Sequence, residues 1–266
     1  MSSLLKLAAL RRSAALQGRV IYALFMREVL TRYGRHNIGF LWLFVEPMLF
    51  TTGVTILWTV SKATHGSSLP IVAFALTGYS SVLLWRNMPA RCIGAIEPNL
   101  ALMYHRNVKA IDIYLARLLL EAGGATISFV TLSLFYIYVE WMEPPDDVLK
   151  VVAGWLMLAW FGASLAMFLG AIGEKTELVE RFWHPASYIM FPLSGAGFIV
   201  DALPTKVQSF MLYVPMVNGV ELLREGYFGS QIQAHYDIPY LLGWCVAMSL
   251  LALAQVAVVG KGITPA

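Results

Sequence analysis

The stretch from Tyr22 to Val60 reads YALFMREVLTRYGRHNIGFLWLFVEPMLFTTGVTILWTV, and its character changes near Gly34. Before that point, apolar side chains recur with helical spacing on one side of an α-helix, at Tyr22, Phe25, Met26, Val29, Leu30 and Tyr33. Polar and mostly basic side chains fall on the opposite side, at Arg27, Glu28, Thr31, Arg32 and Arg35. This division predicts an amphipathic helix in the membrane interface, beside anionic headgroups.

The second half of the stretch predicts a helix that crosses a membrane. Residues 40–60 form a run of 21 positions that is apolar except for Glu46 and a few small polar side chains. At about 1.5 Å per residue, the run covers the roughly 30 Å of bilayer hydrocarbon. Pro47 removes a backbone donor, so we expect a bend there. Glu46 is then either a structural carboxylate paired with a nearby Arg, Trp or Tyr, or part of a cytoplasmic gate.

The composition of the whole chain agrees with a membrane protein. Hydrophobic residues make up 58% of the 266 and charged residues 13%, whereas a soluble domain carries about 25% charged residues. The N-terminus lacks the apolar core and cleavage site of a signal peptide. Cys92 lies near a loop and Cys245 lies far away in sequence, inside an apolar run, so neither a disulfide framework nor a metal site follows from them.

Six apolar segments predict six transmembrane helices, at about 40–60, 69–85, 118–139, 148–172, 182–200 and 238–260. The fifth contains prolines and glycines near its far end, where we expect it to break. Fifteen Lys and Arg residues lie on the side of the termini and four on the other, which places both termini in the cytoplasm. The predicted organisation is a cytoplasmic N-terminus (1–39), a membrane domain (40–260) and a short cytoplasmic tail (261–266).

Two connections between these segments contain further helical patterns. In the cytoplasmic connection, Pro98 suits the first turn of a helix whose apolar face would hold Leu100, Met103 and Tyr104. That face either meets a soluble partner or packs on its own bundle. On the outer side, Pro204 and Pro215 divide residues 201–237 into two short helices. We expect these to re-enter the outer leaflet and to form the mouth of a pathway.

No catalytic or metal-binding constellation is evident. Residues 170–176 end in a glycine, a lysine and a threonine, but Glu174 separates the glycine from the lysine and Phe168 replaces the first glycine of a P-loop. The five histidines lie without metal-ligand spacing.

Arg117 and Glu121 are expected to neutralise each other as an i,i+4 pair. Gly162, Ala166 and Gly170 form a small-residue face for close helix packing, within one chain or between two.

The order of several short motifs resembles the inner-membrane permease of ABC exporters for capsular polysaccharide, within the type-2 ABC permeases that also export O-antigen and teichoic acid. The matching residues are Arg27-Glu28, Thr31-Arg32-Tyr33, Gly39-Phe40-Leu41-Trp42, Glu46-Pro47, Asn99-Leu100, Tyr104, Val108-Lys109, Asp112, Ala116-Arg117, Glu121, Leu203-Pro204, Pro215 and the run from Glu221 to Phe228. Val214 departs from the pattern, because the family often has Asn before this proline.

The resemblance implies a homodimer that binds two copies of a separate ATPase, so that ATP and Mg²⁺ act through this partner and no cofactor is bound by the chain. The residues that would contact the ATPase are Arg27, Glu28, Arg32, Glu97, Asn99, Leu100, Met103, Tyr104 and Arg106, with Glu97–Asn107 as coupling helix. The path of the lipid-linked polysaccharide would include Arg35, Trp42, Glu46, Pro47, Tyr79 and Trp85. The periplasmic mouth would include Pro204, Pro215, Glu221, Arg224 and Tyr227.

The same resemblance places the chain in the bacterial inner membrane, in contact with membrane lipids and with periplasmic and outer-membrane export proteins, and with no role in nucleic-acid binding. Alternatives are an O-antigen or teichoic acid permease, or a proton-coupled secondary transporter with Glu46 and Glu121 as relay. The absence of internally repeated halves weakens the second alternative. A membrane-bound transferase would need an acidic or metal cluster, which the sequence lacks.

Overall fold

The computed structural model describes residues 2–33, 37–61, 69–105 and 108–263, with side chains described in these ranges except at 2–10, 32–33, 37–40, 105 and 263. Every regular element in these ranges is a helix, which confirms the all-α prediction. The longer helices are α1 (Ser2–Tyr33), α2 (Asn37–Val60), α3 (Ile71–Cys92), α5 (Ala110–Tyr138), α6 (Val148–Gly173), α7 (Leu178–Leu193), α9 (Pro215–Phe228) and α10 (Ile238–Ile263). The shorter ones are η1 (Glu97–Asn99), α4 (Leu100–His105), η2 (Val200–Ala202), α8 (Thr205–Leu212) and η3 (Gly229–Gln231).

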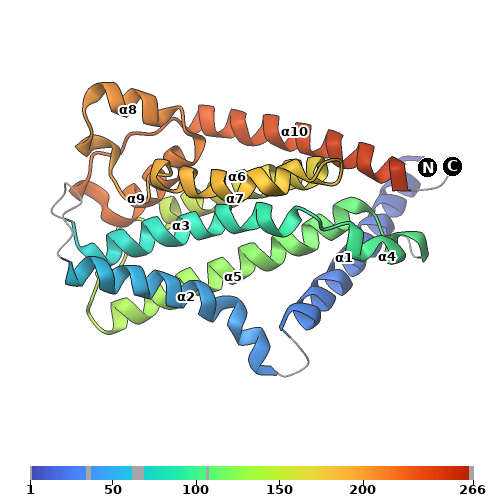
Figure 1. Ribbon diagram of the computed structural model, residues 1–266, viewed down its shortest axis with the longest axis horizontal. Helices are drawn as coiled ribbons and strands as arrows, with labels where there is room; N and C mark the ends of the chain where they lie inside the picture. The colour runs from blue at the N-terminus through green and yellow to red at the C-terminus, as the bar shows by residue number, and fades with distance from the viewer. Residues whose placement is uncertain (1, 34–36, 62–68, 106–107, 264–266) are drawn as a thin grey trace.

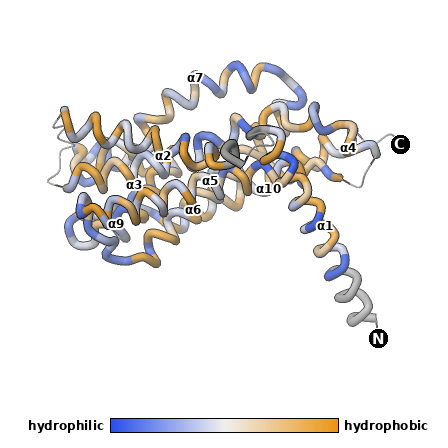
Figure 2. The backbone as a smooth tube through the Cα atoms, turned by 90° about the horizontal axis from the view of Figure 1, so that it is seen from below, coloured by the Kyte–Doolittle hydropathy of each residue, from blue (hydrophilic) through white to orange (hydrophobic). Residues whose placement is uncertain are grey.

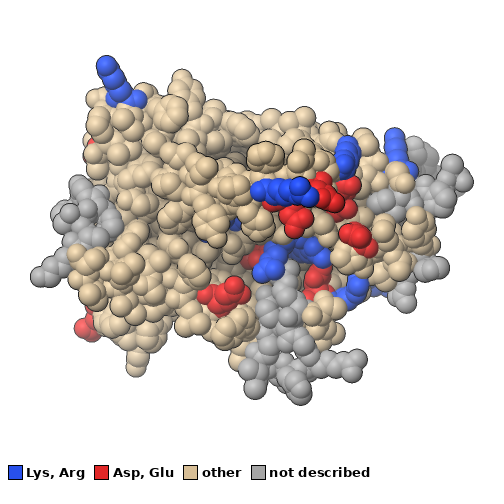
Figure 3. Space-filling view, in the orientation of Figure 1, with Lys and Arg blue, Asp and Glu red and all other residues tan. Residues whose placement is uncertain are grey.

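The long helices lie side by side (Figure 1). Helices α2, α3, α5, α6, α7 and α10 run along the long axis, with α1 and α4 at one end and α8 and α9 at the other. We call these the α1 end and the α9 end. The last turn of α10 also lies at the α1 end, and Figure 2 shows α1 leaving the bundle there. On the face in Figure 3, charged side chains gather mainly toward the α1 end.

Four of the described helices are long and apolar enough to cross a membrane: Leu41–Val60 in α2, Ala110–Tyr138, Val148–Gly173, and Ile238–Gly262 in α10. They correspond to the first, third, fourth and sixth predicted spans, although α5 begins at Ala110 rather than at the predicted Leu118. The second and fifth predicted spans correspond to α3 and α7. Helix α7 has only 16 residues, and α3 carries Arg86 and Arg91 near its end. The count of six spans therefore stays a prediction.

Helix α3 is the centre of the bundle. It packs against α2, α5, α6, α7 and α9, and most of its residues are buried, including Thr77 and Ser81. These two hydroxyls donate within the helix, to the carbonyl oxygens of Ala73 at 2.8 Å and Gly78 at 2.7 Å. A helix that is covered by other helices rather than by lipid tolerates such polar side chains. This placement explains why α3 is less apolar than the other predicted spans.

Glycines allow α6 to approach its neighbours closely. A Cβ atom at Gly162 would lie 2.8 Å from the Cα atom of Trp85 in α3, and one at Gly154 would lie 2.7 Å from the backbone nitrogen of Leu223 in α9. Both separations are shorter than Cβ contacts in proteins, so a larger residue would push the helices apart. The small-residue face of α6 therefore packs against helices of the same chain. The sequence alone left open whether it would pack within one chain or between two.

At the α9 end, the short helices begin at the prolines where the sequence predicted boundaries. Helix α8 begins after Pro204, and α9 has Pro215 in its first turn, which confirms two short helices. Helix α7 ends at Leu193, before Gly195 with a φ of 84°, which confirms the expected break. Helix α9 is largely buried against α6, whereas α8 has no buried residue. Re-entry into the outer leaflet remains a prediction.

The predicted amphipathic helix is longer than expected, because α1 begins at Ser2 rather than near Tyr22. Its predicted apolar face also divides into two. Tyr22, Met26 and Leu30 are exposed along one stripe, while Val29 is buried against the bundle. One stripe is therefore exposed, whereas the other packs α1 against the protein. The interfacial position of α1 stays a prediction.

Candidate functional site

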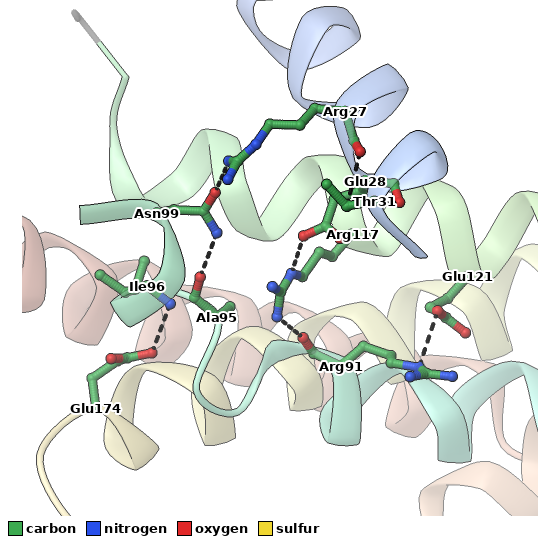
Figure 4. A network of polar contacts seen from close by, with 10 residues as sticks. All are labelled: Arg27, Glu28, Thr31, Arg91, Ala95, Ile96, Asn99, Arg117, Glu121 and Glu174. Atoms are coloured by element: carbon green, nitrogen blue, oxygen red, sulfur yellow. Dashed lines mark hydrogen bonds and ion pairs between the residues drawn. The ribbon is translucent and has the colours of Figure 1, made fainter. Parts of the chain in front are cut away.

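At the α1 end, a network of polar contacts joins α1 to four other elements (Figure 4). Arg27 of α1 donates a hydrogen bond from Nη1 to the Oδ1 atom of Asn99 in η1. Asn99 is buried, and its Nδ2 atom donates to the carbonyl oxygen of Ala95 at 2.8 Å. The structure thus brings together Arg27 and Asn99, two residues that the sequence predicted to contact an ATPase.

The next residue of α1 points into the protein. The Oε1 atom of Glu28 lies 2.6 Å from the Nε atom of Arg117 in α5, and the two side chains are only 17% and 15% exposed. Arg117 also donates to the carbonyl oxygen of Arg91 at 2.7 Å. Glu28, on the side of α1 predicted to be polar, therefore uses its carboxylate to hold α1 against α5 and α3. Its predicted contact with an ATPase stays a prediction.

The predicted i,i+4 pair between Arg117 and Glu121 is wrong. Arg117 pairs with Glu28, and Glu121 lies 3.4 Å from the Nε atom of Arg91 in α3. Helical spacing makes the local pair sterically available. The tertiary arrangement provides a partner for each residue from another helix, and these interhelical pairs bind α1, α3 and α5 together.

Glu174 is a further member of the network. In the sequence it stood out only as a departure from the P-loop motif. It follows α6, and its Oε1 atom accepts a hydrogen bond from the backbone nitrogen of Ile96 at 3.0 Å. Burial raises the pKa of this carboxyl, while the hydrogen bond from Ile96 lowers it and the neighbouring charge of Glu97 raises it. Glu174 therefore ties the loop before η1 to the end of α6. A single carboxylate after a helix leaves no sequence pattern that would have predicted this contact.

Short helices are present where a coupling helix was predicted: η1 is followed directly by α4, with Pro98 in the first turn as expected. The coupling role stays a prediction. Its faces differ from the prediction in part. Leu100 and Met103 are half-buried against the core of the bundle, whereas Tyr104 is 58% exposed. Together with Glu97, Tyr104 forms the exposed side. The outward surface is thus more polar than the predicted apolar face.

Some predicted contact and path residues lie outside the described residues. These are Arg35 and Arg106, together with the side chain of Arg32. Their proposed roles rest on the sequence alone.

Beside this network, four helices enclose a cavity of 230 Å³. Most of its lining residues recur with helical spacing on α2, α3 and α7, and Glu121 comes from α5. The lining consists of Leu43, Glu46, Pro47, Phe50, Leu83, Arg86, Asn87, Ala90, Arg91, Glu121, Trp183, His184, Ser187 and Tyr188. Figure 1 shows α2 changing direction along its length, and Pro47 inside this helix explains the bend. Glu46 and Pro47 of the predicted substrate path thus line a real cavity.

The other predicted path residues lie elsewhere. Trp42 is 54% exposed on the outside of α2, and Trp85 is completely buried with its ring edge against Phe161. Tyr79 is next to the cavity rather than in its wall, stacked on Phe50 with ring centroids 6.1 Å apart. Trp85 is therefore a core residue of α3.

Residues of the predicted periplasmic mouth form a buried cluster at the α9 end. Arg224 is completely buried and donates to the carbonyl oxygens of Gly195, Ala196 and Phe198. Its guanidinium carbon lies 4.0 Å from the ring centre of Phe74. Arg224 thus satisfies the carbonyl groups after α7, which have no partner within that helix.

Two other residues of α9, Glu221 and Tyr227, also form hydrogen bonds with backbone groups of other segments. Glu221 accepts hydrogen bonds from the backbone nitrogens of Val200 and His235, each at 3.2 Å. Tyr227 is buried and donates its hydroxyl hydrogen to the carbonyl oxygen of Glu143. Pro204 is exposed, and Pro215 starts α9. These contacts hold loops to the bundle, so the cluster is a structural element at this end.

Within the described ranges, no three His, Cys, Asp or Glu side chains lie close enough to hold a metal ion. The ionisable groups instead join helices or line the cavity. Apolar helices long enough to span a bilayer, interhelical ion pairs at one end and a polar cavity between helices define a polytopic helical membrane protein.

Comparison with known proteins specifies the family. The family model described as ABC-2 type transporter matches residues 19–228, and the chain belongs to this family. The matched region runs from α1 to the end of α9.

Individual relatives align over almost the entire chain. The capsule polysaccharide export inner-membrane protein CtrC of Neisseria meningitidis serogroup B is 44% identical over 254 residues, covering 95% of this chain and 96% of that protein. The capsule polysaccharide export inner-membrane protein BexB of Haemophilus influenzae is 40% identical, covering 96% of each chain. The polysialic acid transport protein KpsM of Escherichia coli is 26% identical, covering 92% of this chain and 95% of its own length.

Proposed function

We propose that this chain is the membrane permease of an ATP-driven exporter that moves lipid-linked capsular polysaccharide from the cytoplasm to the periplasm across the bacterial inner membrane. The proposal rests on membership of the ABC-2 family together with relatives named for capsule polysaccharide export, the first of which aligns over 95% of this chain. Apolar helices of spanning length support a membrane location. We place six spans in the membrane, with both termini in the cytoplasm.

Energy for transport would come from two copies of a separate ATP-binding subunit, bound to a homodimer of this chain. The departures from a P-loop at Phe168 and Glu174 support a division of labour in which ATP and Mg²⁺ are bound by the partner. The exposed side of η1 and α4 and the neighbouring part of α1 would receive that subunit. Because Glu28 and Glu174 tie this surface to α5 and α6, its displacement would pull on the membrane helices directly.

The proposal can be tested by deleting the gene in its encapsulated host and restoring it from a plasmid. We expect surface polysaccharide, measured with capsule-specific antibody on intact cells, to disappear on deletion and to return on complementation. Polysaccharide should accumulate inside the deletion strain, because synthesis continues without export. Normal surface polysaccharide in the deletion strain would refute the proposal.

A reconstituted system separates the energy source from the cargo. Vesicles that contain this chain and its ATP-binding partner should translocate polysaccharide with ATP. Translocation driven by a pH gradient in the absence of nucleotide would contradict the ABC mechanism and favour a proton-coupled transporter.

A further inference from the structure

Charged groups line the cavity between α2, α3 and α7, and in the proposed six-span arrangement they would lie inside the membrane, where charge is costly. Arg91 is near the end of α3 and also lines a second hollow of 300 Å³ with Glu28 and Arg117, so it marks the α1-end side of the cavity. Arg86 lies five residues earlier in α3, which places it about 7.5 Å deeper along the helix axis. Because ionisable groups inside membrane proteins are costly, they mark substrate or ion pathways.

Arg86 is not engaged by a carboxylate. In the part of the chain that the structure describes, Arg91 pairs with Glu121, whereas Arg86 has no ion pair. The guanidinium carbon of Arg86 instead lies 4.5 Å from the ring centre of Tyr188 in α7. The planar guanidinium fork is suited to a bidentate pair with a carboxylate or a phosphate.

Glu46 lines the same cavity from α2. It is exposed and has no ion pair among the described residues. With Arg91 and Glu121 paired to each other, the cavity offers one guanidinium and one carboxylate to a ligand. An isolated phosphate ion would satisfy Arg86 and leave Glu46 beside a like charge. A molecule that carries both an anionic group and hydroxyl donors satisfies both residues.

Aromatic side chains supply the remaining wall. Trp183 and Tyr188 line it from α7, and Phe50 lines it from α2. Aromatic rings present large apolar faces, which suit the C–H faces of a pyranose ring. A volume of 230 Å³ accommodates one monosaccharide unit.

We infer that this cavity binds one acidic sugar unit of the exported glycan. The carboxylate of the sugar pairs with Arg86, its hydroxyl groups donate hydrogen bonds to Glu46, and its ring packs against Tyr188 and Trp183. This inference rests on the proposed export function and deepens it. It assigns an anionic sugar as the recognised substrate class and Arg86 as the residue that selects the charge.

Binding can be measured with the purified full chain in nanodiscs made of uncharged lipid. Saturation-transfer difference NMR suits the weak binding of single sugars, and the probes are glucuronic acid, glucose and O-phosphoethanolamine. We expect signal transfer to glucuronic acid to exceed transfer to glucose by about tenfold, the effect of one charge-assisted pair. The uncharged methyl ester of glucuronic acid should compete with the acid only as weakly as glucose does, at about tenfold higher concentration.

Variants test separately the proposed roles of Arg86, which pairs with the sugar carboxylate, and Glu46, which accepts from the sugar hydroxyl groups. Arg86→Gln should reduce glucuronic acid binding about tenfold, to the level of glucose, while leaving glucose binding unchanged. Glu46→Gln should weaken the binding of both sugars. Arg181→Gln is the matched control, because Arg181 has a side chain 73% exposed and pairs with Glu177 outside the cavity. It should bind as the wild type does.

Three results would overturn the inference: a retained preference for glucuronic acid in Arg86→Gln, competition by the methyl ester as strong as that by glucuronic acid on the wild-type chain, or displacement of glucuronic acid by O-phosphoethanolamine. The last would identify a zwitterionic lipid headgroup as the ligand. The ester test needs no variant, so it holds even if Arg86→Gln fails to fold. Because binding is measured without ATP or export, a negative result with capsule loss on gene deletion would refute only this inference. A positive result with normal capsule after deletion would refute only the proposed function.

Discussion

The two ends of the bundle both contain an inward-pointing arginine, and they use it differently. At the α9 end, Arg224 is completely buried and donates to three backbone carbonyl oxygens. At the α1 end, Arg117 is 15% exposed beside a 300 Å³ hollow, and it divides its donors between one carbonyl oxygen, that of Arg91, and the carboxylate of Glu28 on another helix. Carbonyl groups fix the backbone itself, whereas paired side chains can exchange partners. We therefore expect the α9 end, where Arg224 binds only backbone carbonyl groups, to be more rigid than the α1 end, where a side-chain pair contributes.

Removing Arg224 should have the largest effect. Arg224→Met leaves three carbonyl oxygens without donors, and we expect it to lower the free energy of unfolding by about 3–5 kcal/mol. Thermal unfolding in detergent, followed by circular dichroism, measures the change. Arg181→Gln removes an exposed arginine and should stay within about 0.5 kcal/mol of wild type. A wild-type unfolding curve for Arg224→Met would show that the α9 end is not fixed by this residue.

The Glu28–Arg117 pair should have an intermediate effect. Glu28→Gln leaves Arg117 partly buried without its carboxylate, at an expected cost of about 1–3 kcal/mol. A double-mutant cycle with Arg117→Gln isolates the pair from other losses. The exchange Glu28→Arg with Arg117→Glu should recover part of the export activity lost in either single variant. Additive single effects would mean that the two side chains are not coupled.

Adjacent residues of α4 should separate stability from partner binding. Met103→Ala removes a half-buried contact with the bundle and should cost about 1–2 kcal/mol of stability. Tyr104→Ala changes an exposed ring, so stability should change by less than about 0.5 kcal/mol. Binding of the purified ATP-binding subunit should weaken in Tyr104→Ala at unchanged unfolding temperature. The opposite pattern would place the partner surface on another face of α4.

The pH dependence contributed by Glu174 should be the smallest effect. Burial raises its pKa above the ordinary value of 4.5, so the folded state binds this proton more tightly than the unfolded state does. The contribution to stability is full below the ordinary value and is lost as pH rises through the raised pKa. Glu174→Gln keeps an acceptor for Ile96 and should flatten this part of the curve of unfolding temperature against pH. An unchanged curve would assign the dependence to another group.

Local features of the fold could be predicted from sequence. Apolar runs located the four helices of spanning length, and Pro204 and Pro215 delimited α8 and α9. The spacing of Gly162, Ala166 and Gly170 predicted a close-packed face, although not its partner α3. Such signals lie within a few residues of one another, where covalent geometry sets the spacing.

Contacts between distant segments could not be predicted in this way. Glu28 and Arg117 are 89 positions apart, and Ile96 and Glu174 are 78 apart. Spacing on one helix offered Arg117 a nearer partner in Glu121, and only the crossing of α1 over α5 determines which pair forms. Arg86 carried no signal either, because its significance depends on Glu46 and Tyr188 from two other helices.

The polar character of α3 has a consequence for biogenesis. A segment with Thr77, Ser81 and Arg86 is a poor substrate for insertion by itself, yet it occupies the centre of the finished bundle. The helices that cover it, α5 and α6, emerge from the ribosome only afterwards. Stable packing of α3 should therefore wait until α6, which ends at Gly173, has left the ribosome. Chains stalled with Tyr138 just outside the ribosome should leave α3 open to protease, and chains stalled with Gly173 just outside should protect it. The bundle would then assemble around α3 rather than one helix at a time.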